Sequence, residues 1–197
     1  MTRWQKWYLE DERLPSIPPS HCAQAAVDLF SEQGKRVILD VGCGAGRDAL
    51  YLSQHGFTVV GVDAAESAVC IAHRLKTERQ LDAILTHADG RKLPFVDASF
   101  DGVYCFGLLH EFTGETRDQD VRAVMGEIHR VLEWGGVLIL VVLSGDPETG
   151  MPAVRLFTEQ MFDEATQSFR LVDKREVADI GCTGREDYKV WRGVFTK

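Results

Sequence analysis

The sequence predicts an α/β fold, a three-layer sandwich in which helices cover both faces of a mostly parallel seven-stranded sheet whose last strand is antiparallel. Two observations lead to this prediction. Apolar runs of strand length alternate with helical patterns along most of the 197 residues, and several runs are almost entirely apolar, which is typical of parallel strands covered on both faces. The last two runs follow each other without an intervening helix, which favours an antiparallel edge on the sheet.

The first half of the chain contains a leading helix, two strand–helix units and a third strand. Ser20 is placed to cap a helix over 21–33, and Gly34 is a typical residue to end it. Two parallel neighbouring strands require a long crossover connection, usually a helix, so the alternation in this half of the chain indicates parallel strands. The strands are expected at 36–41, 57–62 and 83–88, and the crossover helices at 47–55 and 66–79.

The second half contributes four further strands. Those at 101–106 and 137–143 flank a helix at 118–132, and the second of them is the most apolar run in the chain. Thr158 is placed to cap a short helix. The final strands are expected at 169–177 and 188–195. Because the chain contains neither an internal repeat nor an obvious linker, we expect a single domain.

Composition and charge narrow the classes of function. The chain carries 30 acidic and 22 basic side chains, a net charge of -8 that repels phosphate backbones, so no nucleic-acid partner is expected. No run reaches the roughly 20 apolar residues that span a membrane, and the N-terminus lacks the apolar stretch of a secretory signal, so we expect a cytoplasmic protein without a membrane partner. Five cysteines lie far apart without a C-x-x-C pair, so neither a disulfide framework nor a metal site is expected.

A glycine-rich turn between the first strand and the next helix is the strongest local signal. Gly42, Gly44 and Gly46 let the chain turn sharply and let a ligand touch the backbone, because no Cβ intervenes. The dinucleotide pattern G-x-G-x-x-G needs its third glycine one position later, where Arg47 stands. The turn therefore disfavours a nicotinamide-dependent oxidoreductase.

Three carboxylates follow three consecutive strands. Asp40 ends the first strand, Asp63 the second and Asp89 the third, and the carboxyl ends of parallel strands meet at one edge of the sheet. Asp63 is placed to accept hydrogen bonds from both hydroxyls of a ribose, and Asp89 from an exocyclic adenine amine. Asp40 is placed to face an α-ammonium group across the glycine turn. The ligand so described is an adenosine that carries an amino acid.

Several motifs occur in an order and spacing that resemble one family. Over 36–143 the chain reads DVGCGAG, VVGVD, HADGRKLPF, FDGVYCFGLLHEF and LEWGGVLIL. This string resembles the S-adenosylmethionine-dependent methyltransferases with a Rossmann-like seven-stranded sheet. Within that family, GCGAGRDALYLSQHGFTVVGVD is similar to the small tellurite-resistance and thiopurine methyltransferases, although the same residues also fit an ordinary amphipathic helix.

The resemblance implies S-adenosylmethionine as cofactor and divides the domain of 1–197 into three parts. These are an N-terminal lid and helix over 1–34, a cofactor-binding core over 35–143, and an acceptor-side loop with the C-terminal strands over 144–197. Trp4 and Tyr8 share a helical face, on which they either cap the cofactor or pack on the sheet. The expected cofactor-binding residues are Asp40, Gly42, Gly44, Gly46, Asp63, Ala64, Asp89, Gly90, Trp4 and Tyr8.

The acceptor is expected beside the segment that follows the fourth strand. Methyl transfer from a sulfonium is an in-line displacement, so the enzyme mainly aligns the reactants and excludes water. His110 is the candidate general base, with a positioning or structural role as the alternative, and Glu111 stands beside it. Arg155, beyond the loop at 144–152, is a second candidate on the acceptor side.

The main hypothesis is a methyltransferase for a small molecule, with the methyl group going to oxygen, nitrogen, sulfur or a chalcogen. One alternative is a domain that binds S-adenosylmethionine without turnover, whose cofactor residues would look the same. Another is a methyltransferase acting on a macromolecule. Relatives that modify amides or adenine amines carry Asn-Pro-Pro-aromatic after the fourth strand, where this chain reads LLHE, so that subclass is disfavoured.

Overall fold

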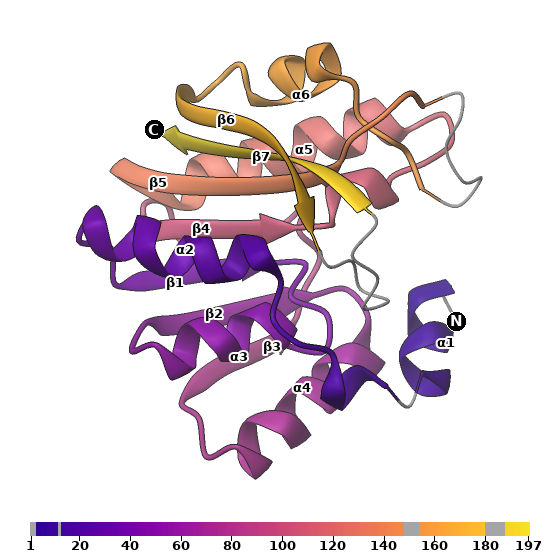
Figure 1. The fold of residues 1–197 in the computed structure, drawn as a ribbon, viewed down its shortest axis with the longest axis vertical. Helices are drawn as coiled ribbons and strands as arrows, with labels where there is room; N and C mark the ends of the chain where they lie inside the picture. Colours follow the sequence, from indigo (N-terminus) through magenta and orange to yellow (C-terminus); the bar gives the residue numbers. More distant parts are fainter. Residues whose placement is uncertain (1–2, 12, 148–153, 180–187) are drawn as a thin grey trace.

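The seven strands form one sheet, which helices cover on both sides (Figure 1). The structure, a computed structural model, describes residues 3–11, 13–147, 154–179 and 188–197, without the side chains of residues 3, 4 and 15. The strands are β1 (Val37–Val41), β2 (Thr58–Asp63), β3 (Ala83–His87), β4 (Phe100–Phe106), β5 (Leu132–Leu143), β6 (Arg170–Asp179) and β7 (Tyr188–Thr196). The helices are α1 (Arg3–Glu10), α2 (His21–Glu32), α3 (Arg47–Gln54), α4 (Glu66–Glu78), α5 (Arg117–Val131) and α6 (Glu159–Thr166), with short 3-10 turns η1 (Leu14–Ser16) and η2 (Leu109–Glu111).

The strand order is β3-β2-β1-β4-β5-β7-β6, which confirms the predicted mostly parallel sheet. The first five strands of this order are parallel neighbours, and β7 runs antiparallel to both β5 and β6. The predicted antiparallel last strand and antiparallel edge are confirmed, and within this edge pair β6 is the outer strand while β7 lies beside β5. The reason is burial: β7 buries Val190, Val194 and Phe195, whereas most of β6 is exposed, so the more apolar strand takes the covered position.

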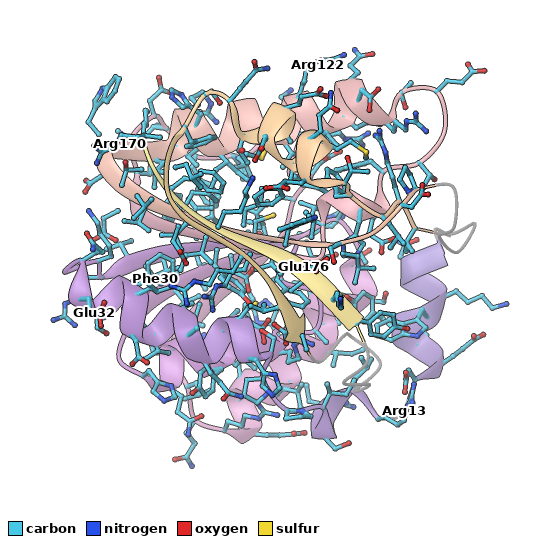
Figure 2. All side chains as sticks on the ribbon, turned by 45° about the horizontal axis from the view of Figure 1, so that its top comes forward. Arg13, Phe30, Glu32, Arg122, Arg170 and Glu176 are labelled. Atoms are coloured by element: carbon cyan, nitrogen blue, oxygen red, sulfur yellow. The ribbon has the colours of Figure 1, made fainter. Side chains whose placement is uncertain are left out.

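Two hydrophobic clusters occupy the two faces of the sheet, which confirms the three layers. Alternate strand residues point to opposite faces, so Leu39 packs with α5 and α6 while Ile38 packs with α2, α3 and α4. Phe30, fully buried, fills the space between α2 and the sheet (Figure 2). The two clusters lie between the helices and the sheet, and the loops that follow the strands lie at the carboxyl ends of the strands.

Side-chain caps begin two of the helices where the sequence predicts them. The hydroxyl of Ser20 accepts a hydrogen bond from the amide of Ala23 in α2, and the hydroxyl of Thr158 accepts one from α6. A cap that the sequence did not reveal comes from Asp179 at the end of β6. Its carboxylate accepts hydrogen bonds from the amides of His21 and Cys22, which lie about 158 residues earlier in the chain. The C-terminal strand pair is therefore tied directly to α2.

The largest boundary difference concerns β5, which starts at Leu132 and not at the predicted Val137. Leu132 pairs with Phe100 of β4, and the pairing register then shifts between Phe100 and Gly102. The amide of Gly135 donates to the carbonyl of Lys197. This backbone pairing keeps the segment in the strand, although Gly135 and Gly136 favour a turn. Pairing partners from distant segments decided this boundary.

Two further features of the described residues bear on earlier expectations. Cys22, Cys43, Cys70 and Cys105 are free thiols, while Cys182 lies outside the residues that the structure describes. In the described part of the chain, every helix is too short or too polar to cross a membrane.

Candidate functional site

A cavity of about 540 Å³ opens at the carboxyl ends of β1, β2 and β4. Its size suits a small organic ligand. Seven of the residues singled out in the sequence line it, namely Tyr8, Gly42, Asp63, Ala64, Asp89, Gly90 and Glu111. The rest of its lining is largely apolar, with Val62, Ala65, Ala88, Phe106, Leu108 and Phe112 as the apolar members. Residues far apart in sequence are thus brought to one edge of the sheet, as expected for this kind of fold.

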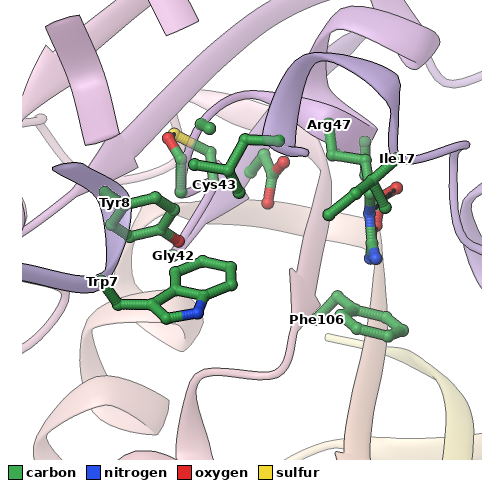
Figure 3. Close-up of a pocket in the computed structure, with 12 residues that line it drawn as sticks. Trp7, Tyr8, Ile17, Gly42, Cys43, Arg47 and Phe106 are labelled. Atoms are coloured by element: carbon green, nitrogen blue, oxygen red, sulfur yellow. Dashed lines mark hydrogen bonds and ion pairs between the residues drawn. The ribbon is translucent and has the colours of Figure 1, made fainter. Parts of the chain in front are cut away.

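A smaller cavity of about 60 Å³ adjoins the larger one, with which it shares Tyr8, Gly42 and Phe106. In Figure 3, Trp7 and Tyr8 lie on one side of it, and Arg47 and Phe106 on the other. Two more expected residues, Asp40 and Gly44, line this cavity, together with Asp48, Leu14 and Ile17. Gly46 lines neither cavity, and a Cβ placed there would lie 3.0 Å from the Cβ of Ala72 in α4. Its role in the structure is close packing.

The glycine turn is tied to β2 by backbone hydrogen bonds. The amides of Gly42 and Cys43 both donate to the carbonyl of Val62, at 2.8 and 2.9 Å. Gly42 and Gly44 have φ angles of +81° and +53°, which side-chain-bearing residues rarely adopt. A Cβ at position 44 would collide with the hydroxyl of Tyr8, so the absence of a side chain lets α1 lie on the turn.

Asp63, at the end of β2, is both a cavity residue and a structural anchor. Its Oδ2 accepts a hydrogen bond from the amide of Gly44, and its Oδ1 accepts one from the amide of Ala65, both at 2.8 Å. Burial raises the pKa of Asp63, while these two amide hydrogen bonds act in the opposite direction. Each carboxylate oxygen keeps capacity for a second hydrogen bond, so the same group can also accept from a ligand in the cavity.

Asp89, after β3, pairs with Arg91. The guanidinium Nη2 lies 2.7 Å from Oδ2 of Asp89, and the Arg91 amide donates to the other oxygen. The hydrogen bond from the Arg91 side chain holds the pKa of Asp89 below its ordinary value. Arg91 also bonds Asp120 of α5 at 2.8 Å. The carboxylate therefore stays ionised at the cavity wall and its direction is set by the arginine.

Asp40 is the most unusual group in the site. Its side chain is 2% exposed, it lines the smaller cavity, and it has no hydrogen-bond partner among the described residues. Burial raises the pKa of Asp40 well above its ordinary value, and the nearby Asp48 and Asp63 add to this effect. A buried polar group without a partner is costly, so its presence at a cavity points to a ligand group.

The sequence did not reveal a second buried carboxylate, that of Asp48. It accepts hydrogen bonds from the amide and hydroxyl of Ser20 at 2.9 and 2.8 Å, and from the hydroxyl of Tyr104 at 3.3 Å. The guanidinium of Arg47 adds two more, from Nε at 2.9 Å and Nη2 at 2.8 Å. The only available signal was an acidic residue at the start of an otherwise buried helix. Such a residue is usually read as a helix-dipole partner.

His110 and Glu111 are adjacent, but only Glu111 lines the larger cavity. Nδ1 of the buried His110 accepts a hydrogen bond from the amide of Leu143 at 3.1 Å. The neutral ring therefore carries its hydrogen on Nε2, which lies 3.6 Å from Oε1 of Glu111. With its acceptor nitrogen engaged by the backbone, His110 is arranged to hold Glu111 in place.

Two other expected residues lie apart from the cavity. The guanidinium of Arg155 pairs with Asp118 at 2.5 Å and lines a separate pocket of about 300 Å³ near α5 and α6. Among the described residues, its link to the site is a hydrogen bond from its amide to the carbonyl of His110, at 2.7 Å. Trp4 belongs to α1, but its side chain lies outside the described residues.

Several residues that line the cavities were not among the site residues predicted from the sequence, and three of them lie beside the expected lid and acceptor segments. Trp7 of α1 faces the smaller cavity, and Leu108 and Phe112 flank η2 at the wall of the larger one. Trp7 belongs to the aromatic N-terminal arm, which fits a cofactor lid or core packing equally, whereas Leu108 and Phe112 gave no chemical signal because isolated apolar residues near loops are common in any core.

Comparisons with known proteins agree with this arrangement. A demethylmenaquinone methyltransferase from Thermus thermophilus is 35% identical over 125 residues, which are 62% of this chain and 54% of that enzyme. The chain spans about half the length of this relative. A ubiquinone biosynthesis O-methyltransferase from Idiomarina loihiensis is 29% identical over 169 residues, or 77% of this chain and 65% of that enzyme.

Among solved structures, the PH0226 protein of Pyrococcus horikoshii superposes with a TM-score of 0.74 and is 20% identical, covering 97% of this chain and 98% of that one. At this identity the likeness shows the fold, which confirms the predicted Rossmann-like methyltransferase architecture. S-Adenosylmethionine is the cofactor of such enzymes. The family model described as a methyltransferase domain matches residues 39–140, about half of the sequence and nearly all of the site, and the chain therefore belongs to the methyltransferase-domain family.

Proposed function

We propose that this chain transfers a methyl group from S-adenosylmethionine to a small-molecule acceptor, at oxygen, nitrogen, sulfur or a chalcogen. The observation that carries the proposal is the pair of adjoining cavities at one sheet edge, lined by the glycine turn and by three carboxylates from consecutive strands. Two relatives are named as a demethylmenaquinone methyltransferase and a ubiquinone biosynthesis O-methyltransferase, and these names support a small acceptor. A cytoplasmic location and the lack of a nucleic-acid partner, both expected from composition, belong to the same proposal.

The residues of the two cavities fit this cofactor. The buried carboxyl of Asp40 suits the α-ammonium group, and Gly42 and Gly44 line the same small cavity without side chains, which suits the amino-acid portion. Asp63 can accept from the ribose hydroxyls while it holds the turn, and the ionised Asp89 can accept from the adenine amine. Ala64 and Gly90, which line the larger cavity, add backbone contacts without side-chain bulk.

The acceptor side of the proposal rests on the segment after β4. When bound, the cofactor supplies a methyl group on a positively charged sulfur. The chain contributes alignment and the exclusion of water, to which the apolar Leu108 and Phe112 are suited. Glu111 faces the cavity and is placed to accept a hydrogen bond from an acceptor hydroxyl or amine, with His110 positioning it. In this arrangement His110 is a positioning residue and Glu111 touches the acceptor.

The three segments predicted from the sequence take part unequally. Tyr8, from 1–34, and many residues of 35–143 line the larger cavity, whereas no described residue of 144–197 does so. The segment 144–197 contributes indirectly, since the amide of Arg155 donates to the carbonyl of His110, while Leu143 at the end of β5 donates to the His110 ring. We therefore propose that the acceptor lies over η2, away from the guanidinium of Arg155.

The experiment that tests the function has two arms. Isothermal titration calorimetry with S-adenosylhomocysteine should show binding of one molecule per chain. A screen of phenols, thiols, amines and metalloid oxyanions with methyl-labelled cofactor should then show a labelled product for at least one class. Failure to bind S-adenosylhomocysteine would overturn the proposal, whereas binding without any methylated product would favour the non-catalytic alternative.

A further inference from the structure

A further cavity, of about 300 Å³, lies beside α5 and α6, which pack on the same face of the sheet (Figure 1). Among the described residues, its lining shares none with the two cavities of the candidate site. A space of this size is at the lower end of the range of cavities that hold small organic ligands. Four lining residues are apolar, and the other five are charged or polar, namely Asp118, Arg122, Arg155, Glu164 and Gln167.

Arg155 brings a largely buried positive charge to this cavity. Its side chain is 15% exposed, and its Nη1 pairs with Asp118 at 2.5 Å. Its Nε is buried and has no hydrogen-bond partner among the described residues. The guanidinium also lies 5.8 Å from the centroid of the Phe157 ring. A buried donor without an acceptor is costly, so its presence beside a cavity points to an acceptor group supplied by a ligand.

Positive charges outnumber negative ones around this cavity, against the sign of the chain as a whole. Asp118 is shared by two guanidiniums, that of Arg155 and that of Arg117 at 3.7 Å. The hydrogen bond from Arg155 lowers the pKa of Asp118, and the nearby charge of Arg122 adds to this effect. The second carboxylate, that of Glu164, accepts a hydrogen bond within α6. Three guanidiniums thus surround two engaged carboxylates in a chain of net charge -8, which leaves a local excess of positive charge for an anion.

The apolar part of the lining indicates the rest of the ligand. Val121 of α5 and Phe157 are buried, and Met161 and Ala165 of α6 are partly buried in the same cluster. A bare inorganic anion would leave this apolar surface uncovered, whereas an alkyl or aryl group would cover it. A guanidinium matches the planar geometry of a carboxylate. The lining is therefore complementary to a carboxylate that carries an apolar group.

We propose that this cavity is a second ligand site, which takes a small organic carboxylate with an apolar body and holds its charged end with Arg155 and Arg122. The site is joined to the acceptor segment, because the amide of Arg155 donates to the carbonyl of His110 at 2.7 Å. A ligand in this cavity therefore influences η2 without entering the cofactor cavities. The inference does not depend on the proposed function, since the residues that carry it line neither of those cavities.

Amide NMR titrations of the unmodified protein with hexanoate, 1-hexanol and hexylamine test the inference, because the three probes share a six-carbon chain and differ in charge. Hexanoate should bind with a Kd of about 1 mM. The other two probes should bind at least about 10-fold more weakly. Equal affinities for the three probes would overturn the inference.

The positions of the shifted signals locate the bound probe. Hexanoate should shift the amide signals of Val121, Arg155 and Ala165, and through Arg155 that of Glu111 in η2. The signal of Gly44 should stay in place. Shifts at Gly44 without shifts at Val121 and Ala165 would place the probe in the cofactor cavities and contradict the second site. A Glu111 signal that does not move would remove the connection to η2.

Variants assign the preference for hexanoate to Arg155. Arg155→Gln removes the charge, so it should weaken hexanoate at least about 10-fold and change 1-hexanol by no more than about 2-fold. Arg155→Lys restores the charge without the planar fork and should recover part of the affinity. Arg74→Gln is the matched control, because Arg74 is an exposed cation on α4 that pairs only loosely with Glu78, at 3.8 Å.

Arg122→Gln keeps the test decisive if the change at the buried Arg155 disturbs folding. Arg122 is exposed on α5, so its replacement should leave the fold intact. The loss of an exposed charge at the cavity should weaken hexanoate about 2- to 5-fold without changing 1-hexanol. Unchanged affinity for hexanoate in this variant would contradict the proposed site.

Discussion

Replacing Asp63 by alanine should destabilise the protein as well as weaken cofactor binding, because its carboxylate holds two backbone amides. The amides of Gly44 and Ala65 each donate to one carboxylate oxygen at 2.8 Å. A hydrogen bond to a charged acceptor contributes about 1.5–3 kcal/mol. Burial, which raises the pKa of Asp63, also means that the ionised carboxylate is partly desolvated. Removing this desolvated charge is favourable and offsets part of the free energy lost with the two hydrogen bonds. We expect a net decrease of about 2–3 kcal/mol in the free energy of unfolding.

The assay is urea unfolding followed by circular dichroism, combined with calorimetry of S-adenosylhomocysteine. Asp89→Ala provides the matched control, since this carboxylate also ends a strand at the cavity but bonds mainly to the half-exposed Arg91. Its free energy of unfolding should stay within about 0.5 kcal/mol of the unmodified protein. An Asp63→Ala variant that is as stable as this control would refute the anchoring role of the carboxylate.

Three further predictions concern the site. Affinity for S-adenosylhomocysteine should fall as the pH is lowered through the raised pKa of Asp40, because the protonated carboxyl no longer attracts an ammonium; calorimetry across pH should show this slope, and Asp40→Asn should abolish it. Glu111→Gln should lower kcat/KM about 10- to 100-fold with cofactor affinity nearly unchanged. Steady-state kinetics with an acceptor found in the screen tests this, and a rate equal to that of the unmodified protein would contradict it. Tyr8→Ala should weaken cofactor binding by about 1–2 kcal/mol in calorimetry, and unaltered affinity would remove α1 from the site.

Local patterns were sufficient for most of the fold. The alternation of buried strands and amphipathic helices placed all seven strands, and Ser20 and Thr158 mark two helix starts correctly. These features follow from periodicity and capping, which involve residues close together in sequence. The start of β5 at Leu132 did not follow, because pairing with Phe100 and Lys197 overrides the turn preference of the two glycines.

The candidate site divides in the same way. Parallel strands must end at a common edge, so the sequence by itself determined that Asp40, Asp63 and Asp89 gather around the glycine turn. Only the tertiary structure decided that His110 is engaged by Leu143 and that Arg155 lines a different pocket. It also decided that Ser20 and Tyr104 hold Asp48 beside Arg47, and that Asp179 caps α2. The physical reason is that hydrogen bonds between distant segments depend on how the layers pack, and they leave no periodic trace along the chain.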